Sequence, residues 1–186
     1  MNARKIMIKI LIIIIIIAAI VGWYFYYNPI EKKIDITTTG IQFRNNDPSG
    51  YFEEKEITIK GTYKQFLFGN KDDIFSGQFS VEGYDFTFDE KYSSPHILLA
   101  PQGGHILYFT ANLTESKLLG YIHSDVYLKE IMIAIRSEEP NNYNNYANGF
   151  VISAPAKNRA EAVEIAENLF NKSALNGLWK DWAGWN

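Results

Sequence analysis

Apolar residues gather in one continuous run near the start of the chain, from Ile6 to Tyr27. The run contains six consecutive isoleucines and has no charged residue after Lys9. Its charge-free part, Ile10 to Tyr27, spans about 27 Å as a helix at roughly 1.5 Å per residue, close to the ~30 Å hydrocarbon core of a bilayer. The pattern predicts a transmembrane signal anchor over residues 6–27, contacting membrane lipid and ending in an aromatic cluster at the headgroup layer.

Charge predicts the orientation of this anchor. Arg4, Lys5 and Lys9 precede the end of the span, and the first acidic residue is Glu31. Under the positive-inside rule the N-terminus is therefore cytoplasmic and the remaining chain is extracytoplasmic. We expect a single-pass protein of the bacterial cell membrane, with residues 1–5 as the cytoplasmic flank, 28–33 as a short linker and 34–186 as one domain.

A cleaved secretory signal is the alternative interpretation of the same run. It needs an apolar core of about 7–15 residues followed by a small-x-small cleavage site. The run here is longer, and the small residues Ala18, Ala19 and Gly22 are interrupted by Ile20 and Val21. The chain also has no cysteine for lipid attachment. These features favour an uncleaved anchor.

Beyond Lys33 the apolar residues alternate with a period of two, which is typical of strands with one buried face. Phe75, Gly77, Phe79 and Val81 alternate with polar residues, and a Glu82–Gly83 turn would pair this segment with Tyr84–Asp89 as a hairpin. Ile131–Ile135 is apolar on both faces and predicts a central, buried strand. The other expected strands are 34–44, 57–63, 96–100, 105–113, 118–123, 126–136 and 150–153.

The pattern changes to a helical period after residue 157. Asn158 is the expected N-cap, with Glu161 as its N3 partner, and Gly177 is the expected stop. An apolar stripe follows the capping residues at Ala162, Ile165, Ala166, Leu169 and Phe170. The predicted fold class is α+β: a transmembrane helix, then a curved antiparallel β-sheet, either half-barrel or sandwich, with one C-terminal helix. Residues 138–149, rich in asparagine, are expected to form a loop or lid.

The net charge of the chain after the apolar run restricts the classes of molecule that it can bind. Of 18 basic residues three precede Tyr27, so the rest of the chain carries 15 basic and 21 acidic side chains, a net charge of −6. This sign disfavours nucleic acid, and no nucleic-acid partner is expected. The absence of cysteine excludes disulfides and thiolate metal sites.

Several short motifs resemble a known group of proteins. Gly149–Ala156 followed by Asn158-Arg159, together with Phe75-Ser76-Gly77, Gly83-Tyr84 and the isoleucine-rich anchor, resembles small uncharacterised membrane-anchored extracytoplasmic proteins of Gram-positive bacteria. That group has no assigned activity, so the resemblance implies a location and no site residues.

The three histidines are the candidates for metal or acid–base chemistry. His96 and His105 flank one expected hairpin, where Asp85 or Asp125 would supply a third ligand, and His123 lies near Asp125. None belongs to a short metal-binding motif, and no serine has a nucleophile-elbow pattern. We therefore expect the histidines at solvent-exposed strand ends, with no catalytic residue, metal ligand or cofactor assigned.

Aromatic side chains are the candidates for binding. Trp179, Trp182 and Trp185 are spaced by three and would line one side of a helical turn, as a platform for sugar rings or a wedge into headgroups. Tyr143 and Tyr146 in the asparagine-rich segment would contact glycans. The alternative is that the tryptophans cover the sheet edge and close the core.

Three functions remain open. The first is a membrane-tethered, non-enzymatic binding or accessory module at the bacterial cell surface, recognising an envelope glycan or a neighbouring membrane protein. The second is an envelope hydrolase using a histidine and an aspartate. The third is an immunity-type protein that intercepts a toxin at the membrane.

Overall fold

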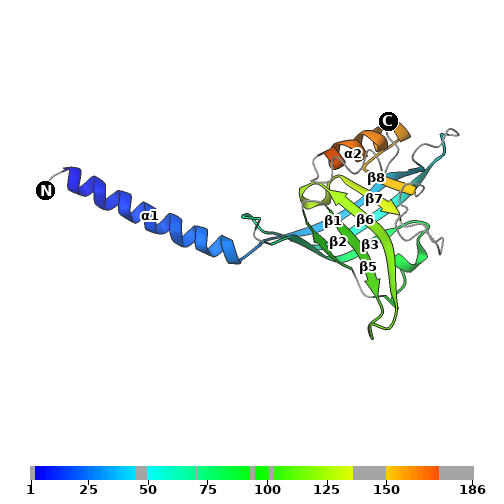
Figure 1. Cartoon of the computed structure of the whole chain (residues 1–186), viewed down its shortest axis with the longest axis horizontal. Coiled ribbons are helices and arrows are strands. Elements are labelled where there is room, and N and C mark those ends of the chain that lie inside the picture. Colours follow the sequence, from blue (N-terminus) through cyan, green and yellow to red (C-terminus); the bar gives the residue numbers. More distant parts are fainter. Residues whose placement is uncertain are drawn as a thin grey trace.

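The computed structural model describes residues 3–44, 50–69, 71–92, 95–100, 103–135 and 150–171. A long helix, α1 (Ala3–Tyr27), projects from a β-rich domain that carries a second helix, α2 (Arg159–Asn171), on its surface (Figure 1). Ile6–Tyr27 is the one segment of the described chain that is long and apolar enough to cross a membrane, with mean hydropathy 3.0, and none of it is buried.

Eight strands form one antiparallel sheet in the order β4-β3-β2-β1-β8-β7-β6-β5. The strands are β1 (Ile30–Arg44), β2 (Phe52–Gln65), β3 (Asp73–Val81), β4 (His96–Leu99), β5 (Gly104–Phe109), β6 (Ser116–Ser124), β7 (Ile131–Ile135) and β8 (Phe150–Ala154). The edge strands β4 and β5 approach each other at two isolated bridges, Ala100↔Gly103 and Tyr92↔Thr110. The sheet is therefore a nearly closed barrel, which confirms the predicted curved antiparallel sheet.

Two apolar cores lie on opposite faces of this sheet. The larger fills the barrel and contains Phe75, Phe79 and Ile133. The smaller lies between the outer face of the sheet and α2, and contains Ile41 and Met132. Because side chains alternate along a strand, β7 contributes to both cores and is buried at all five positions. The prediction that Ile131–Ile135 is a central, buried strand is confirmed.

The start of α2 is capped as its sequence predicts. The Asn158 side-chain oxygen accepts a hydrogen bond from the Glu161 amide at 3.0 Å. The Glu161 carboxylate accepts in return from the Lys157 amide at 2.9 Å and from the Asn158 side-chain amide at 2.8 Å. These bonds satisfy amide groups that the first turn of a helix leaves without intrahelical partners. The expected stop at Gly177 lies outside the described residues.

The predicted hairpin between Phe75–Val81 and Tyr84–Asp89 is wrong. β3 pairs with β2 and β4, whereas the second segment forms a 3₁₀ turn, η1 (Asp85–Thr87). The Thr87 hydroxyl accepts from the Val81 amide at 3.1 Å, and the Ser80 hydroxyl donates to the Thr87 carbonyl at 3.0 Å. These buried bonds fold the segment back onto the barrel, so Tyr84 and Phe86 pack against the core without strand pairing, whereas Phe88 stays exposed.

Two other predicted boundaries also change. The strand expected over 126–136 begins at Ile131, because Val126–Leu128 forms a second 3₁₀ turn, η2. The expected linker 28–33 is shorter, because β1 already begins at Ile30. Asn28 closes α1 by donating its backbone and side-chain amides to the Tyr24 carbonyl at 3.0 and 2.9 Å. Only Asn28 and Pro29 therefore separate the apolar helix from the barrel.

Candidate functional site

The aromatic residues predicted to bind ligand lie outside the described residues. This applies to Trp179, Trp182 and Trp185, and to Tyr143 and Tyr146 with the rest of the asparagine-rich segment. Their proposed roles therefore stay predictions.

The structure gives the three histidines three different environments. His96 is exposed on β4, and its Nδ1 lies 2.8 Å from the Ser76 hydroxyl. His105 is exposed on β5 and packs edge-on against the Tyr121 ring, with centroids 4.9 Å apart. Among the described residues no three His, Cys, Asp or Glu side chains are grouped as a metal site would require. The Asp85 and Asp125 carboxylates thus complete no histidine site in this part of the chain.

His123 departs from the expectation of a solvent-exposed strand end. It is only 4% exposed, because its ring lies between the rings of Tyr121 and Phe170, each with its centroid 5.1 Å away. Burial disfavours the charged imidazolium and lowers the pKa of His123 to about 4. The sequence interpretation was wrong here because Phe170 of α2 covers a strand position that would otherwise face water.

The residues of β6, β7 and β8 that lie side by side under α2 also argue against Ser153 as a nucleophile. Ser153 of β8 pairs with Met132 of β7, which pairs with His123 of β6. Ser153 and His123 are thus two strands apart, roughly 10 Å, with a methionine between them. The Ser153 hydroxyl is fully buried and has no hydrogen-bond partner. A general base must lie within hydrogen-bond reach of its nucleophile, and His123 is too far from Ser153 to act as its base.

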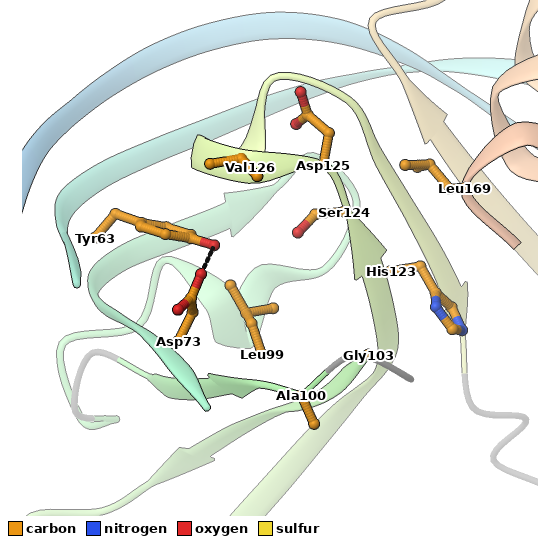
Figure 2. A pocket seen from close by; sticks show the side chains of 10 residues that line it. All are labelled: Tyr63, Asp73, Leu99, Ala100, Gly103, His123, Ser124, Asp125, Val126 and Leu169. Carbon is orange, nitrogen blue, oxygen red and sulfur yellow. Dashed lines mark hydrogen bonds between the residues drawn. The ribbon is translucent and has the colours of Figure 1, made fainter. Parts of the chain in front are cut away.

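A cavity of about 190 Å³ opens at the end of the barrel where β1 begins (Figure 2). Tyr63 donates its hydroxyl hydrogen to Asp73 at 2.8 Å, and the second Asp73 oxygen accepts from the Phe66 amide at 2.8 Å. Ser124 is turned toward this pair in Figure 2, whereas the His123 ring points away from it. The lining residues are Tyr63, Asp73, Leu99, Ala100, Gly103, His123, Ser124, Asp125, Val126 and Leu169.

The carboxylates of this cavity are held by the backbone. Asp125 accepts from the Lys129 and Glu130 amides at 2.7 and 2.9 Å, which fixes the turn after η2. Burial, reinforced by the bond to Asp73, raises the pKa of the Tyr63 phenol, so the phenol stays protonated. The cavity therefore offers acceptor oxygens and hydroxyl groups in fixed positions, a lining suited to holding a small polar molecule.

Tyr127 packs against the cavity residue Tyr63 and connects it to β1. Its ring packs edge-on against Tyr63 at 5.3 Å, and its hydroxyl donates to the Gln65 side chain at 2.9 Å. The Lys32 amine lies 4.1 Å from the centre of the same ring, which is within the range of a cation–π contact. Sequence reasoning did not single out these residues, because the register of β2 and β3 brings Tyr63 to Asp73 and barrel closure brings Tyr127 from η2 to β1 and β2.

A second, shallower hollow of about 530 Å³ lies where β8 ends beside β1. Thr37, Thr38 and Thr39 form one side, and Pro155, Ala156 and Lys157 form another. β8 pairs with Ile41–Arg44, and the Ala156 amide then donates to the Thr39 carbonyl at 3.1 Å. Within the described residues no strand pairs with Ile30–Thr38 on the edge facing away from β2.

The chain matches no protein-family model, no curated protein and no solved structure. The resemblance to membrane-anchored proteins of Gram-positive bacteria thus stays a prediction.

Proposed function

We propose that this chain is a single-pass membrane protein whose barrel domain is a non-enzymatic binding or accessory module at the bacterial cell surface. The observation that carries the proposal is the exposure of α1. Ile6–Tyr27 has mean hydropathy 3.0 and no buried part, so its apolar side chains are left open to the surroundings. Apolar surface of this extent is unfavourable in water and favourable in a bilayer.

The junction between helix and barrel supports a retained anchor over a cleaved signal. Cleavage near Ala19 or Gly22 would leave an aromatic peptide attached to β1. Trp23, Tyr24 and Tyr27 of that peptide are at least half exposed in the structure. A headgroup layer suits these amphipathic rings, which makes an uncleaved span the better account of the segment.

Binding is favoured over catalysis by how the polar groups are used. The carboxylates of the cavity accept hydrogen bonds from backbone amides and from Tyr63, and so hold turns in place. The buried imidazole of His123 and the hydroxyl of Ser153 are separated by Met132. Ser76 and His96 do lie within hydrogen-bond reach at 2.8 Å, but His96 is exposed on β4 and no described carboxylate bonds to its ring. The described residues thus provide fixed hydrogen-bonding groups but no hydroxyl, imidazole and carboxylate in line.

Topology can be tested with single cysteines, since the natural chain has none. Leu113 is exposed in the turn after β5, and Asn2 precedes α1. In intact cells, a membrane-impermeant maleimide should label Leu113→Cys at once and Asn2→Cys only after permeabilisation. The full-length product should stay with the membranes after carbonate extraction. Release of a shortened product into the medium would show a cleaved signal, and the reverse labelling pattern would place the barrel in the cytoplasm.

The ligand class can be tested with the purified full chain in nonionic detergent. Sedimentation with isolated peptidoglycan is expected for a glycan-binding module, and Trp182→Ala should weaken it if the predicted tryptophan platform takes part. An Asn112→Ala variant in the turn after β5 serves as the surface control. Absence of sedimentation for the natural chain would exclude the glycan and leave a membrane protein as the partner to be sought.

A further inference from the structure

The turn between β2 and β3 carries exposed apolar side chains to the outer end of α1. Leu67 is 49% exposed and Phe68 is 55% exposed. In Figure 1 the tip of the β2–β3 ribbon extends out of the barrel toward the end of the helix. The rings of Phe68 and Tyr26 lie with their centroids 6.2 Å apart. The turn is therefore level with the aromatic end of the apolar helix.

Strand register dictates this position. Ile30, the first residue of β1, pairs with Gln65, the last residue of β2. Since only two residues separate Ile30 from α1, the turn that follows Gln65 must lie beside the last turn of the helix. A barrel built on this register cannot move its β2–β3 turn away from the anchor without losing the β1–β2 pairs.

The turn is braced so that its apolar side chains point outward. Asp73 accepts the Phe66 amide and the Tyr63 hydroxyl, each at 2.8 Å, which fixes both ends of the loop. The Gly69 amide donates to the Phe66 carbonyl at 3.3 Å, and Gly69 has φ of +62°, a conformation that favours glycine. The loop thus holds Leu67 and Phe68 away from the barrel core by its own hydrogen bonds.

The charges beside the turn fit a headgroup layer. The Lys71 amine lies 5.3 Å from the centre of the Phe66 ring, so its aliphatic stem follows apolar surface while the amine is exposed. Asp72 is the neighbouring acid, and Lys64 is paired with Glu31 at 2.9 Å. Because these two positive and two negative charges cancel, contact with lipid would be driven by apolar burial and would depend little on salt.

We propose that the β2–β3 turn, residues 66–69 with 71 and 72, is a second membrane contact that inserts Leu67 and Phe68 into the headgroup layer beside α1. The contact would hold one face of the barrel against the bilayer. The proposal rests on the proposed function in one respect, because it requires α1 to lie in the membrane.

The test uses spin labels on single cysteines in the full chain, reconstituted into vesicles of phosphatidylcholine and phosphatidylglycerol. Phe68→Cys reports the turn, and Phe52→Cys is its matched control, because Phe52 is 51% exposed at the opposite end of β2. Ile14→Cys reports the centre of α1. Accessibility to apolar oxygen and to a water-soluble nickel chelate is measured by power saturation.

The label at residue 68 should favour oxygen over the nickel chelate, as the label at residue 14 should, whereas the label at residue 52 should favour the chelate. If residue 68 behaves like residue 52 while residue 14 is in lipid, the second contact is refuted and the anchor stands. If residue 14 is accessible to the chelate, the proposed anchor fails, and the second contact fails with it.

A second measurement covers the case in which Phe68→Cys disturbs the turn. The spin label is placed at Lys71→Cys, where it distinguishes barrels whose β2–β3 turn lies in the lipid from barrels whose turn lies in water. Adding Leu67→Ser and Phe68→Ser should raise the ratio of turns in water to turns in lipid about tenfold, equivalent to ~1.4 kcal/mol. The paired control adds Phe52→Ser, which should leave the ratio unchanged. An equal response to both changes would overturn the proposal.

Discussion

Acid should destabilise the domain through His123. The imidazole is 4% exposed and lies between Tyr121 of β6 and Phe170 of α2. No described hydrogen bond or ion pair is made to its ring, so burial is the cause that lowers its pKa to about 4. An unfolded chain would expose the same side chain to water and restore its ordinary value of 6.5.

The sign of the effect follows from proton counting. Between about pH 6.5 and pH 4 the unfolded chain binds a proton at His123 that the folded chain does not bind, so acid favours unfolding. At 1.36 kcal/mol per unit, the difference of about 2.5 units between the two pKa values sets the scale. The free energy of unfolding should fall by about 2 kcal/mol from neutral pH to about pH 5, and by about 3 kcal/mol to about pH 4.

Urea unfolding of the full chain in nonionic detergent measures this free energy, with the strand band in circular dichroism as the signal. The matched variant is His123→Phe, which keeps an aromatic ring between Tyr121 and Phe170 but removes the titration. The difference between natural chain and variant cancels the contribution of other acids and should grow as the pH falls. His105→Phe, at an exposed position, should preserve the acid dependence. If the free energies of unfolding of the natural chain and of His123→Phe fall equally with pH, the reasoning is refuted.

Three further substitutions test the fold. Asn158→Ala should cost about 1 kcal/mol, because the Glu161 amide loses its cap, whereas Asn158→Ser should restore most of it in the same urea assay. Ile133→Ala should cost about 3 kcal/mol by opening a cavity at a fully buried position of β7, and a loss below ~1 kcal/mol in thermal unfolding would contradict the barrel core. Gly77→Ala should cost about 2–3 kcal/mol, since its φ of +153° favours glycine and a Cβ would lie 2.2 Å from the Lys60 carbonyl oxygen; equal stability of this variant in denaturant would argue against the β2–β3 register.

The elements that sequence reasoning predicted are those whose signals are local. The apolar run of α1, the cap of α2 and the two-sided apolar pattern of β7 each depend on neighbouring residues in the chain. The alternation of Tyr84, Phe86 and Phe88 is also local, but a strand is not the only structure that satisfies it. Tyr84 donates to the Gln42 side chain at 2.8 Å and Phe86 packs on Tyr108 with centroids 5.4 Å apart, so a 3₁₀ turn brings these two rings to the core and leaves Phe88 exposed.

The candidate site was harder to predict because it depends on strand register. The sequence around Asp73 indicates a turn, and the sequence around Tyr63 indicates one face of a strand, so neither pattern shows that the two residues meet. Only the pairing of β2 with β3 brings the carboxylate to the phenol. The burial of His123 depends likewise on where α2 crosses the sheet, because Phe170 lies far along the chain from β6. The periodicity of apolar residues and the composition of the chain do not predict contacts between residues so far apart in the sequence.

The pairing of β1 with β8 orders the events of folding. Ile41 lies opposite Ser153 and Phe43 opposite Val151, so β1, the first strand of the chain, completes its pairing only when β8, the last strand, has formed. Contacts between such distant parts of a chain form slowly. Until β8 arrives, Ile41 and Phe43 also lack the cover of α2, which follows β8 in the chain. A newly made chain would therefore expose an incomplete sheet with uncovered apolar side chains until β8 and α2 have been made.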